Sequence, residues 1–307
     1  MLKNKKGEQQ YLDLLKDVLD NGKLVEDRTN TGCIRVFSRS MRFDLSEGIP
    51  LLTTKKIRWE NVIGELLWML SGQTDLPSLR KYQCKPEGAK TIWTDDFEKY
   101  WQRSEQAQQF PDGVACLDRL YEDGGIIYGS TLRSYCNSVD QLTTLIENIK
   151  LTKANPSYSM GRRLKCEFWN PTVHLDSDSM NAALPSCHTG FQCMVDGDKL
   201  NLKFNMRSND LFLGCPYNVF FYGVLVHILA KLTGLQVGEL VYDGTDCHIY
   251  SNHLEQVRTQ ITRIPKGFPK LVLPEFTTLG ELLTMTAEDF EVIGYNPEGF
   301  ISAPQAS

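Results

Sequence analysis

The chain alternates between stretches whose apolar residues recur at helical spacing and stretches typical of strands. Helical spacing predicts helices over residues 9–20, 59–70, 139–152 and 218–232. Strands are predicted over residues 33–43, 164–169, 189–195, 199–206 and 239–242. The last helix, 218–232, is apolar nearly all round, which is typical of a helix buried on every side.

Two of the strands are predicted to form a hairpin. Thr189–Val195 and Lys199–Met206 are separated by Asp196-Gly197-Asp198, where glycine tolerates the positive backbone angle of a tight turn. Because such a turn aligns the strands, Cys187 is expected near Arg207. A guanidinium stabilises the thiolate of a cysteine, whose unperturbed pKa is roughly 8.5. Cys187 is therefore a candidate nucleophile, although a cysteine is more often a small buried hydrophobe.

Several other polar positions each allow two interpretations. Glu65 interrupts the apolar face of helix 59–70, so it either reaches the surface or serves in proton transfer. The loop 26–32 and the pair Arg162-Arg163 could each hold a phosphate or simply be solvated. The stretch 243–253 contains two histidines but no Cys/His set at zinc spacing, so we expect no metal.

Composition limits the class of protein. With 307 residues, 41% of them hydrophobic, and no linker or repeat, we expect a single domain over residues 1–307. Residues 94–123 are expected to be an irregular region or insertion. A formal net charge of -5 argues against a protein that coats nucleic acid.

Cysteine usage and hydropathy indicate the compartment. The nine cysteines include no CxxC pair, which argues against a zinc ribbon or a disulfide framework and favours a reducing compartment. The N-terminus is polar and unlike a signal sequence, and no apolar run approaches the roughly 18 residues that a membrane span needs. We therefore expect a cytoplasmic protein without a membrane segment.

The ordered motifs of the chain resemble those of the thymidylate synthase family across nearly the whole length. The matching segments are Asp27-Arg28-Thr29, Leu52-Thr53-Thr54-Lys55, Glu65-Leu66-Leu67-Trp68, Ile92-Trp93, Tyr128-Gly129, Arg162-Arg163, Pro185-Ser186-Cys187-His188, Arg207-Ser208-Asn209-Asp210, Leu213-Gly214, Asn218, His248-Ile249-Tyr250-Ser251-Asn252-His253 and Gly294-Tyr295. The resemblance implies an α/β (α+β) fold with one large mixed sheet packed by helices, and a homodimer with back-to-back sheets. It also implies dUMP as substrate and 5,10-methylenetetrahydrofolate as co-substrate.

Residue roles follow from the resemblance, position by position. It implies that Cys187 adds to C6 of the pyrimidine. The catalytic residues would be Cys187, Glu65, Tyr128, Arg207 and His188. The nucleotide would be bound by Arg28, Arg207, Ser208, Asn209, Asp210, Asn218, His248 and Tyr250, and by Arg162 and Arg163 of the partner subunit. The folate would contact Lys55, Trp93, Asp210, Gly214, Tyr217 and Ala306.

Asn218 is expected to select the base. Uracil presents an N3–H donor beside an O4 acceptor, and a carboxamide supplies the complementary pair. An aspartate at this position would suit cytosine, as in the deoxycytidylate hydroxymethylases of the family. The wrong pairing would cost on the order of 1–3 kcal/mol, which favours dUMP.

The two products of the family differ in whether hydride or water reaches the methylene at C5. Three departures from the synthase pattern favour water. The expected lid 301–307 has Gln305 and Ser307 where apolar residues are usual, the segment 205–210 resembles the hydroxymethylase version, and Gly244-Thr245-Asp246 replaces Gly-Gly-Asp. The sequence hypothesis is therefore a deoxyuridylate hydroxymethylase, of the kind bacteriophages use to make modified DNA. The alternatives are a thymidylate synthase and, from another class, an inactive binding protein.

Overall fold

A six-stranded mixed sheet organises the molecule, for which a computed structural model describes residues 7–26, 31–103, 122–174 and 181–305. The strand order is β1-β2-β6-β5-β4-β3. The strands are β1 (Lys23–Val25), β2 (Cys33–Asp44), β3 (Lys165–Glu167), β4 (His188–Asp196), β5 (Lys199–Asp210) and β6 (Gln236–Tyr250). Neighbours are antiparallel except β5 and β6, which run parallel. The mixed sheet expected from the resemblance is therefore confirmed.

The predicted hairpin is present. β4 and β5 pair from Asp196 opposite Lys199 to His188 opposite Met206, with a register shift between His188 and Gly190. Gly190 has φ +154, and a Cβ there would lie 2.5 Å from the carbonyl oxygen of Cys166. Only glycine therefore permits β3 to approach β4 this closely, just beyond Cys187.

The strand predicted over residues 239–242 was too short. β6 runs from Gln236 to Tyr250 and pairs along most of its length with β2 and β5. Its second half contains half-exposed or exposed polar residues such as Asp243 and Thr245 alternating with buried ones such as Gly244. The second half of the strand was not predicted because these polar side chains interrupt its apolar pattern. A sheet with one uncovered face tolerates polar residues at every second position.

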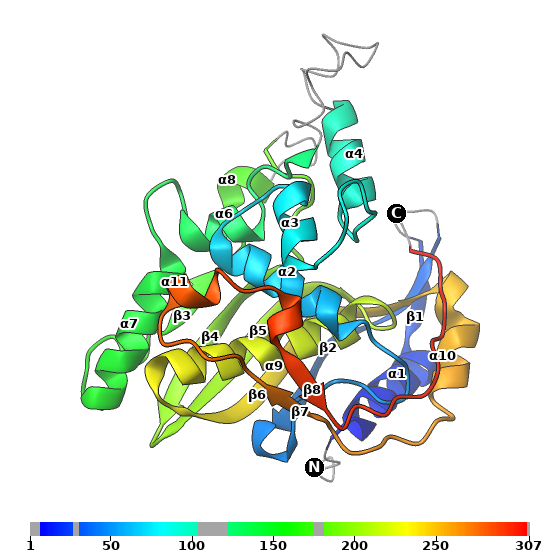
Figure 1. Cartoon of the computed structure of the whole chain (residues 1–307). Coiled ribbons are helices and arrows are strands. Elements are labelled where there is room, and N and C mark those ends of the chain that lie inside the picture. The colour runs from blue at the N-terminus through cyan, green and yellow to red at the C-terminus, as the bar shows by residue number, and fades with distance from the viewer. Residues whose placement is uncertain (1–6, 27–30, 104–121, 175–180, 306–307) are drawn as a thin grey trace.

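Helices cover one face of the sheet (Figure 1). The four predicted helices are present as α1 (Gln9–Asn21), α2 (Trp59–Ser71), α7 (Gln141–Ala154) and α9 (Gly214–Thr233). Shorter helices are α3 (Leu76–Tyr82), α4 (Thr94–Arg103), α6 (Tyr128–Arg133), α8 (Pro171–His174), α10 (Leu254–Gln260) and α11 (Leu279–Leu282). A separate two-stranded sheet joins β7 (Lys270–Val272) to β8 (Glu291–Ile293). The 3-10 turns are η1 (Leu45–Glu47), η3 (Ser251–His253) and η4 (Ala287–Asp289).

The core lies between the sheet and helices α9 and α2. Side chains of the covered sheet face, among them Phe204 and Tyr242, are fully buried, and Phe204 stacks on Tyr222 of α9 at 4.0 Å between ring centroids. Among the described residues, α9 alone is long and apolar enough to cross a membrane by composition. It is 78% buried, as expected of a core helix.

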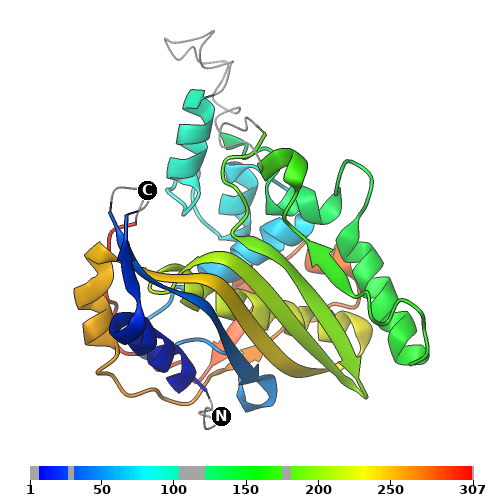
Figure 2. The same ribbon diagram turned by 180° about the vertical axis from the view of Figure 1, so that it is seen from behind.

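The opposite face of the sheet is open. In Figure 2 the strands β4, β5 and β6 face the viewer with no helix of the described chain in front of them. This face mixes charge and apolar surface: Arg42 pairs with Glu239 at 2.5 Å, while Phe37 is 80% and Met194 55% exposed. A large uncovered sheet face of this kind indicates an interaction surface.

The region 94–123 is only partly irregular. Residues 94–103 form α4, whose first turn carries Asp95 and Asp96, as favoured by the helix dipole. Residues 104–121 lie outside the described part of the chain, so the rest of this expectation stays untested.

Candidate active site

Cys187 and Arg207 meet at one end of the β4–β5 hairpin. The backbone N–H of Arg207 donates to the carbonyl oxygen of Cys187 at 3.0 Å, and the guanidinium Nη2 lies 3.8 Å from the cysteine sulfur. The proximity predicted from the tight turn is therefore present. A cation at this distance stabilises the thiolate form of a cysteine.

The guanidinium of Arg207 is held in place by the chain on either side of the thiol. Its Nε donates to the carbonyl of Ser186 at 2.8 Å, and its Nη2 donates to that of Pro185 at 3.1 Å. The group also lies 5.5 Å from the centroid of the Trp169 ring. These contacts fix the cation before any substrate binds, so little of its rotamer freedom has to be lost on binding.

Tyr128, at the start of α6, contacts the backbone of Cys187. Its hydroxyl oxygen accepts hydrogen bonds from the N–H of Cys187 at 2.8 Å and of His188 at 3.4 Å. Burial, and then the neighbouring Cys187, raise the pKa of the Tyr128 phenol well above its usual value. The phenol therefore keeps its proton at neutral pH and has an O–H to donate.

Glu65 lies on α2 and is bonded to Trp93. The indole Nε1–H of Trp93 donates to Oε1 of Glu65 at 2.8 Å. Burial raises the pKa of Glu65, and this hydrogen bond partly opposes the effect. Trp93 also contacts Tyr128 edge to face at 6.0 Å between ring centroids. One chain of contacts thus links the carboxylate to the phenol beside the cysteine.

His188 is neutral in this site. Burial lowers its pKa to about 4, which the adjacent amide of Asn218 partly opposes. Its Nδ1 lies 3.0 Å from the hydroxyl oxygen of Tyr222 on α9. A neutral imidazole can serve as a hydrogen-bond partner here, but it carries no charge near pH 7.

Asn218, Asn209 and Asp210 converge around Gly214, the first residue of α9. A Cβ at Gly214 would lie 3.5 Å from Nδ2 of Asn209, 3.7 Å from Nδ2 of Asn218 and 3.8 Å from Cβ of Asp210. Asn218 stays half-exposed, whereas Asn209 is buried and its Oδ1 has no hydrogen-bond partner among the described residues. The site therefore offers carboxamide groups to a base.

His248 is oriented by two residues that the sequence did not single out for this role. Oδ1 of Asp246 lies 3.1 Å from Nδ1 of His248, and Nη1 of Arg35 donates to Oδ2 of Asp246 at 3.0 Å. Tyr250 contacts the imidazole edge to face at 5.0 Å between ring centroids. The only sequence signal was the spacing of Asp246 and His248, which puts both on one face of a strand.

Lys55 does not reach the surface in this structure. It is 3% exposed. Its Nζ donates to the carbonyl of Phe212 and lies 3.7 Å from the centroid of the Phe212 ring. Burial lowers its pKa to about 7. Contact with a folate tail, which stays a prediction, would require the side chain to turn outward. Tyr217 and Trp93, the other expected folate contacts, are half-buried and buried.

The two arginines expected to bind phosphate from the partner subunit, Arg162 and Arg163, are exposed just before the edge strand. They precede β3, in which Lys165 pairs with Gln192 and Glu167 with Gly190. The antiparallel register places Lys165, just after these arginines, opposite Gln192. Gln192 lies five residues beyond Cys187, which is roughly 16 Å along β4 at about 3.3 Å per residue. Arg28 and Ala306 lie outside the described residues.

The C-terminal tail is docked on the body of the protein. The N–H of Glu298 donates to the carbonyl of Thr53 at 2.7 Å, and Nε2 of His253 lies 2.7 Å from the carbonyl oxygen of Pro304. Ile301 and Ala303 pack against the core, whereas Gln305 is exposed. The tail thus presents its small apolar residues inward and its glutamine outward.

No group of three or more His, Cys, Asp or Glu side chains suited to a metal occurs in the described ranges. What the described site gathers is a thiol, guanidinium, phenol, carboxylate, imidazoles and carboxamides. Such a set is suited to nucleophilic and acid–base chemistry on a polar ring.

The side chains gathered here suit covalent catalysis on a polar ring, and sequence comparison identifies the family. The family described as Thymidylate synthase matches residues 9–307, so the chain belongs to the thymidylate synthase family. The chain is 42% identical, over 305 residues, to "Probable thymidylate synthase" of Escherichia phage T5. The match covers 97% of this chain and 100% of the phage protein.

Proposed function

We propose that the protein transfers a one-carbon unit from 5,10-methylenetetrahydrofolate to C5 of dUMP, with Cys187 as nucleophile. The observation that carries this proposal is the surroundings of Cys187. Its sulfur lies 3.8 Å from Nη2 of Arg207, and its backbone N–H donates to the Tyr128 hydroxyl. The folate would supply the methylene group and, in the synthase reaction, a hydride.

Cys187 would begin the reaction by forming an Sγ–C6 bond. The C5–C6 electron pair then moves toward O4 and makes C5 nucleophilic. The half-exposed amide of Asn218 would accept from N3–H and donate to O4. Once C5 has bonded to the methylene, loss of the C5 proton would accompany cleavage of the bond from that methylene to the folate nitrogen. Addition of hydride, or of water, to the methylene would then let the sulfur depart and restore the C5–C6 double bond, so the enzyme would end with a free thiol.

Glu65 and Tyr128 would move the protons. The raised pKa of Glu65 suits a carboxylate that orders water and takes part in proton transfer near neutral pH. Tyr128 would assist in removing the C5 proton. Trp93 contacts both side chains and would hold them in one arrangement.

The phosphate would be bound from two subunits. Arg207 and Ser208 lie next to the cysteine within one chain, whereas Arg162 and Arg163 come just before β3, whose register places them farther along β4. A second copy packed on the open sheet face would bring its own Arg162 and Arg163 to this site. The exposed Phe37 and Met194 on that face support such a back-to-back homodimer.

We propose reduction, giving dTMP and dihydrofolate, as the final step. The name of the T5 protein favours this product. The docked tail also supports it, because Ile301 and Ala303 pack inward while Gln305 is exposed, which weakens the sequence argument for a wet lid. By the same relationship, we propose a phage-encoded enzyme acting in the host cytoplasm.

A deoxyuridylate hydroxymethylase is the second candidate. Asn209 is the observation that favours water addition. Its buried amide oxygen has no partner among the described residues and would accept a hydrogen bond from a water held close to the base. The sequence hypothesis of water addition rested on this segment, on the tail and on Gly244-Thr245-Asp246, and the comparisons do not support preferring it.

The test is to incubate the protein with dUMP and methylenetetrahydrofolate and identify both products. We expect dTMP with dihydrofolate; 5-hydroxymethyl-dUMP with tetrahydrofolate would replace reduction by water addition. Cys187→Ala should abolish turnover while nucleotide binding persists, and Cys84→Ala, at an exposed cysteine, is the matched control. A 5-fluoro-dUMP complex without an adduct on Cys187 would overturn the covalent scheme.

A further inference from the structure

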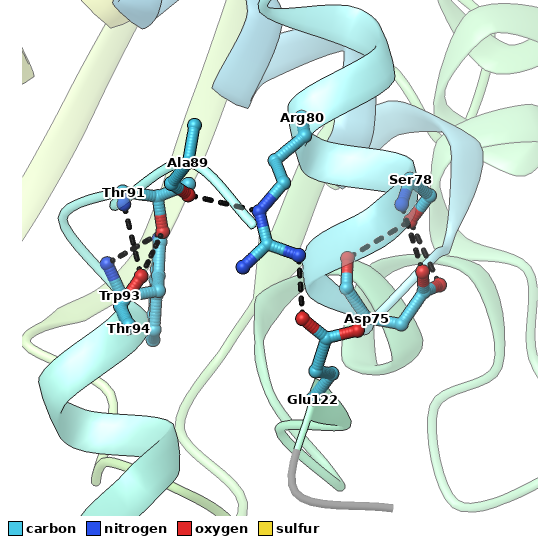
Figure 3. Close-up of polar contacts among 8 residues, drawn as sticks. All are labelled: Asp75, Ser78, Arg80, Ala89, Thr91, Trp93, Thr94 and Glu122. Atoms are coloured by element: carbon cyan, nitrogen blue, oxygen red, sulfur yellow. Dashed lines mark hydrogen bonds and ion pairs between the residues drawn. The ribbon is translucent and has the colours of Figure 1, made fainter. Parts of the chain in front are cut away.

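A buried ion pair lies beside the active site and has no role in the chemistry proposed above. Nη1 of Arg80, on α3, donates to Oε1 of Glu122 at 2.5 Å, and the two residues are 5% and 9% exposed. Nε of the same guanidinium donates to the carbonyl oxygen of Ala89 at 2.9 Å. Figure 3 shows the guanidinium between these two acceptors.

These acceptors flank the region 94–123 in sequence. Ala89 precedes it, and Glu122 lies at its end. The returning chain is fastened to the start of α3 as well: Gly124 N–H donates to the carbonyl of Thr74 at 2.9 Å, and the hydroxyl of Thr74 donates to Oδ1 of Asp123 at 2.8 Å. α3 therefore holds both ends of the region, and Arg80 is the side chain that bonds to both.

The Ala89 contact continues to the catalytic carboxylate. Two residues after Ala89, the N–H of Thr91 donates to the hydroxyl of Thr94 at 2.9 Å, and the N–H of Trp93 donates to that of Thr91 at 3.2 Å. This compact turn places the Trp93 indole, whose Nε1–H bonds Glu65. The turn is drawn beside Arg80 in Figure 3.

We propose that Arg80 is a positioning residue for the reaction, which fixes the 89–94 turn through the Ala89 carbonyl and so holds Trp93 against Glu65. The inference rests on the proposed role of Glu65. Arginine suits the task because its planar guanidinium donates in two fixed directions at once, whereas a lysine ammonium cannot reproduce that fork. Removing Arg80 would leave the Ala89 carbonyl and the Glu122 carboxylate buried without this donor.

Stability and positioning can be separated with a double variant. Replacing a buried ion pair by apolar residues often leaves stability unchanged, so Arg80→Leu/Glu122→Leu should recover much of the Tm that Arg80→Leu alone loses. It cannot restore the donor to Ala89. We therefore expect kcat to stay at least about tenfold below the parent protein in both variants, since small misplacements of catalytic groups cost this much.

The affinity for dUMP is the internal reference. Arg80 does not touch Cys187, Arg207 or Asn218 in this structure, so the Kd for dUMP should change less than about twofold while kcat falls. Lys90→Met is the matched control, because Lys90 forms an exposed ion pair with Asp95 in the same turn at 2.8 Å. It removes a cation there without removing a donor to Ala89.

A pH profile adds a readout that a purely structural role would not move. The bond from Trp93 lowers the pKa of Glu65 against the effect of burial, and Lys85 and Tyr217 are the other titratable groups beside this carboxyl. Loss of the Trp93 bond should therefore move the acidic limb of kcat to higher pH. Arg80→Lys should recover Tm more than it recovers kcat.

An activity-independent measurement keeps the inference testable if dUMP is not the substrate. The chain has five tryptophans, so an indole N–H spectrum of the labelled protein is simple, and Trp93→Phe assigns one signal. That signal should shift and exchange faster in Arg80→Leu and in the double variant, but not in Lys90→Met. Unchanged Trp93 signal, kcat and acidic limb in the double variant would overturn the role of Arg80. If the parent protein does not turn over dUMP but the Trp93 signal still shifts in Arg80→Leu, the proposed function is overturned and the role of Arg80 stands.

Discussion

At the scale of single residues, the burial of Lys55 predicts how stability changes with pH. Burial lowers its pKa to about 7 from an ordinary value of 10.5. Between these values the unfolded state binds one proton more than the folded state, so stability should rise with pH across this window. The limiting slope for one proton is about 1.4 kcal/mol per pH unit.

Lys55→Met tests this expectation. Methionine fills a similar volume without a charge, so the variant should lose the rise in unfolding free energy between pH 7 and 10 that the parent protein shows. Urea unfolding at several pH values measures it. Lys56→Met, at an exposed neighbour, should leave the slope unchanged. Parallel curves for Lys55→Met and the parent protein would show that Lys55 is charged when folded.

The residues that carry chemistry could be identified from the sequence, but most of the side-chain contacts around them could not. The thiol of Cys187 and the guanidinium of Arg207 were placed together correctly, because a tight hairpin fixes the relation between two strand ends. The burial of Lys55 and the bond from Trp93 to Glu65 could not be foreseen. They depend on side-chain directions set by packing between segments distant in sequence.

At the scale of elements, β6 shows how a strand orients a binding residue. Asp246 and His248 lie two positions apart on it, and β2 supplies Arg35 opposite His248. The bond from His248 and, more weakly, Arg35 lower the pKa of Asp246, so this carboxylate is ionised at neutral pH and accepts from Nδ1–H. In the tautomer with the proton on Nδ1, Nε2 would be left as an acceptor for the 3′-hydroxyl of the proposed substrate.

Asp246→Asn should disturb this arrangement without removing His248. The amide can donate to Nδ1, which would shift the proton to Nε2 and turn it into a donor. We expect KM for dUMP to rise about tenfold with kcat within about threefold, because the imidazole loses the charged partner that orients it and the 3′-hydroxyl would have to change from donor to acceptor. Steady-state kinetics with dUMP and its 3′-deoxy analogue measure the effect. The variant and parent protein should be alike with the 3′-deoxy analogue; an equal penalty on both nucleotides would contradict the role of Asp246.

Elements with one strong periodicity were predicted well, and those with mixed burial were not. Helix α2 and strand β2 were placed within one residue of their observed ends, because their patterns are long and regular. β6 was recognised only at 239–242, and α9 starts at Gly214, four residues before the predicted start. At both places polar functional residues replace the apolar pattern that marks an element, which is expected near a site.

At the scale of the whole molecule, the decisive feature is that one chain does not gather all the expected phosphate-binding residues. Arg162 and Arg163 precede β3 at the sheet edge, on the side away from Cys187. The open sheet face is the surface on which we propose that a second copy packs. If two chains share each site, a mixture of two inactive variants should regain activity.

We expect recovery of activity when Cys187→Ala is refolded together with Arg162→Ala/Arg163→Ala. Random pairing makes half of the dimers mixed, and each mixed dimer has one site with an intact cysteine and intact partner arginines, which is about one quarter of all sites. Turnover of the mixture measures this recovery. Cys187→Ala with Glu65→Gln is the matched control and should recover nothing, because both residues belong to the same chain's half of the site. Recovery in neither mixture, or full activity of the arginine variant alone, would show that each chain forms its site by itself.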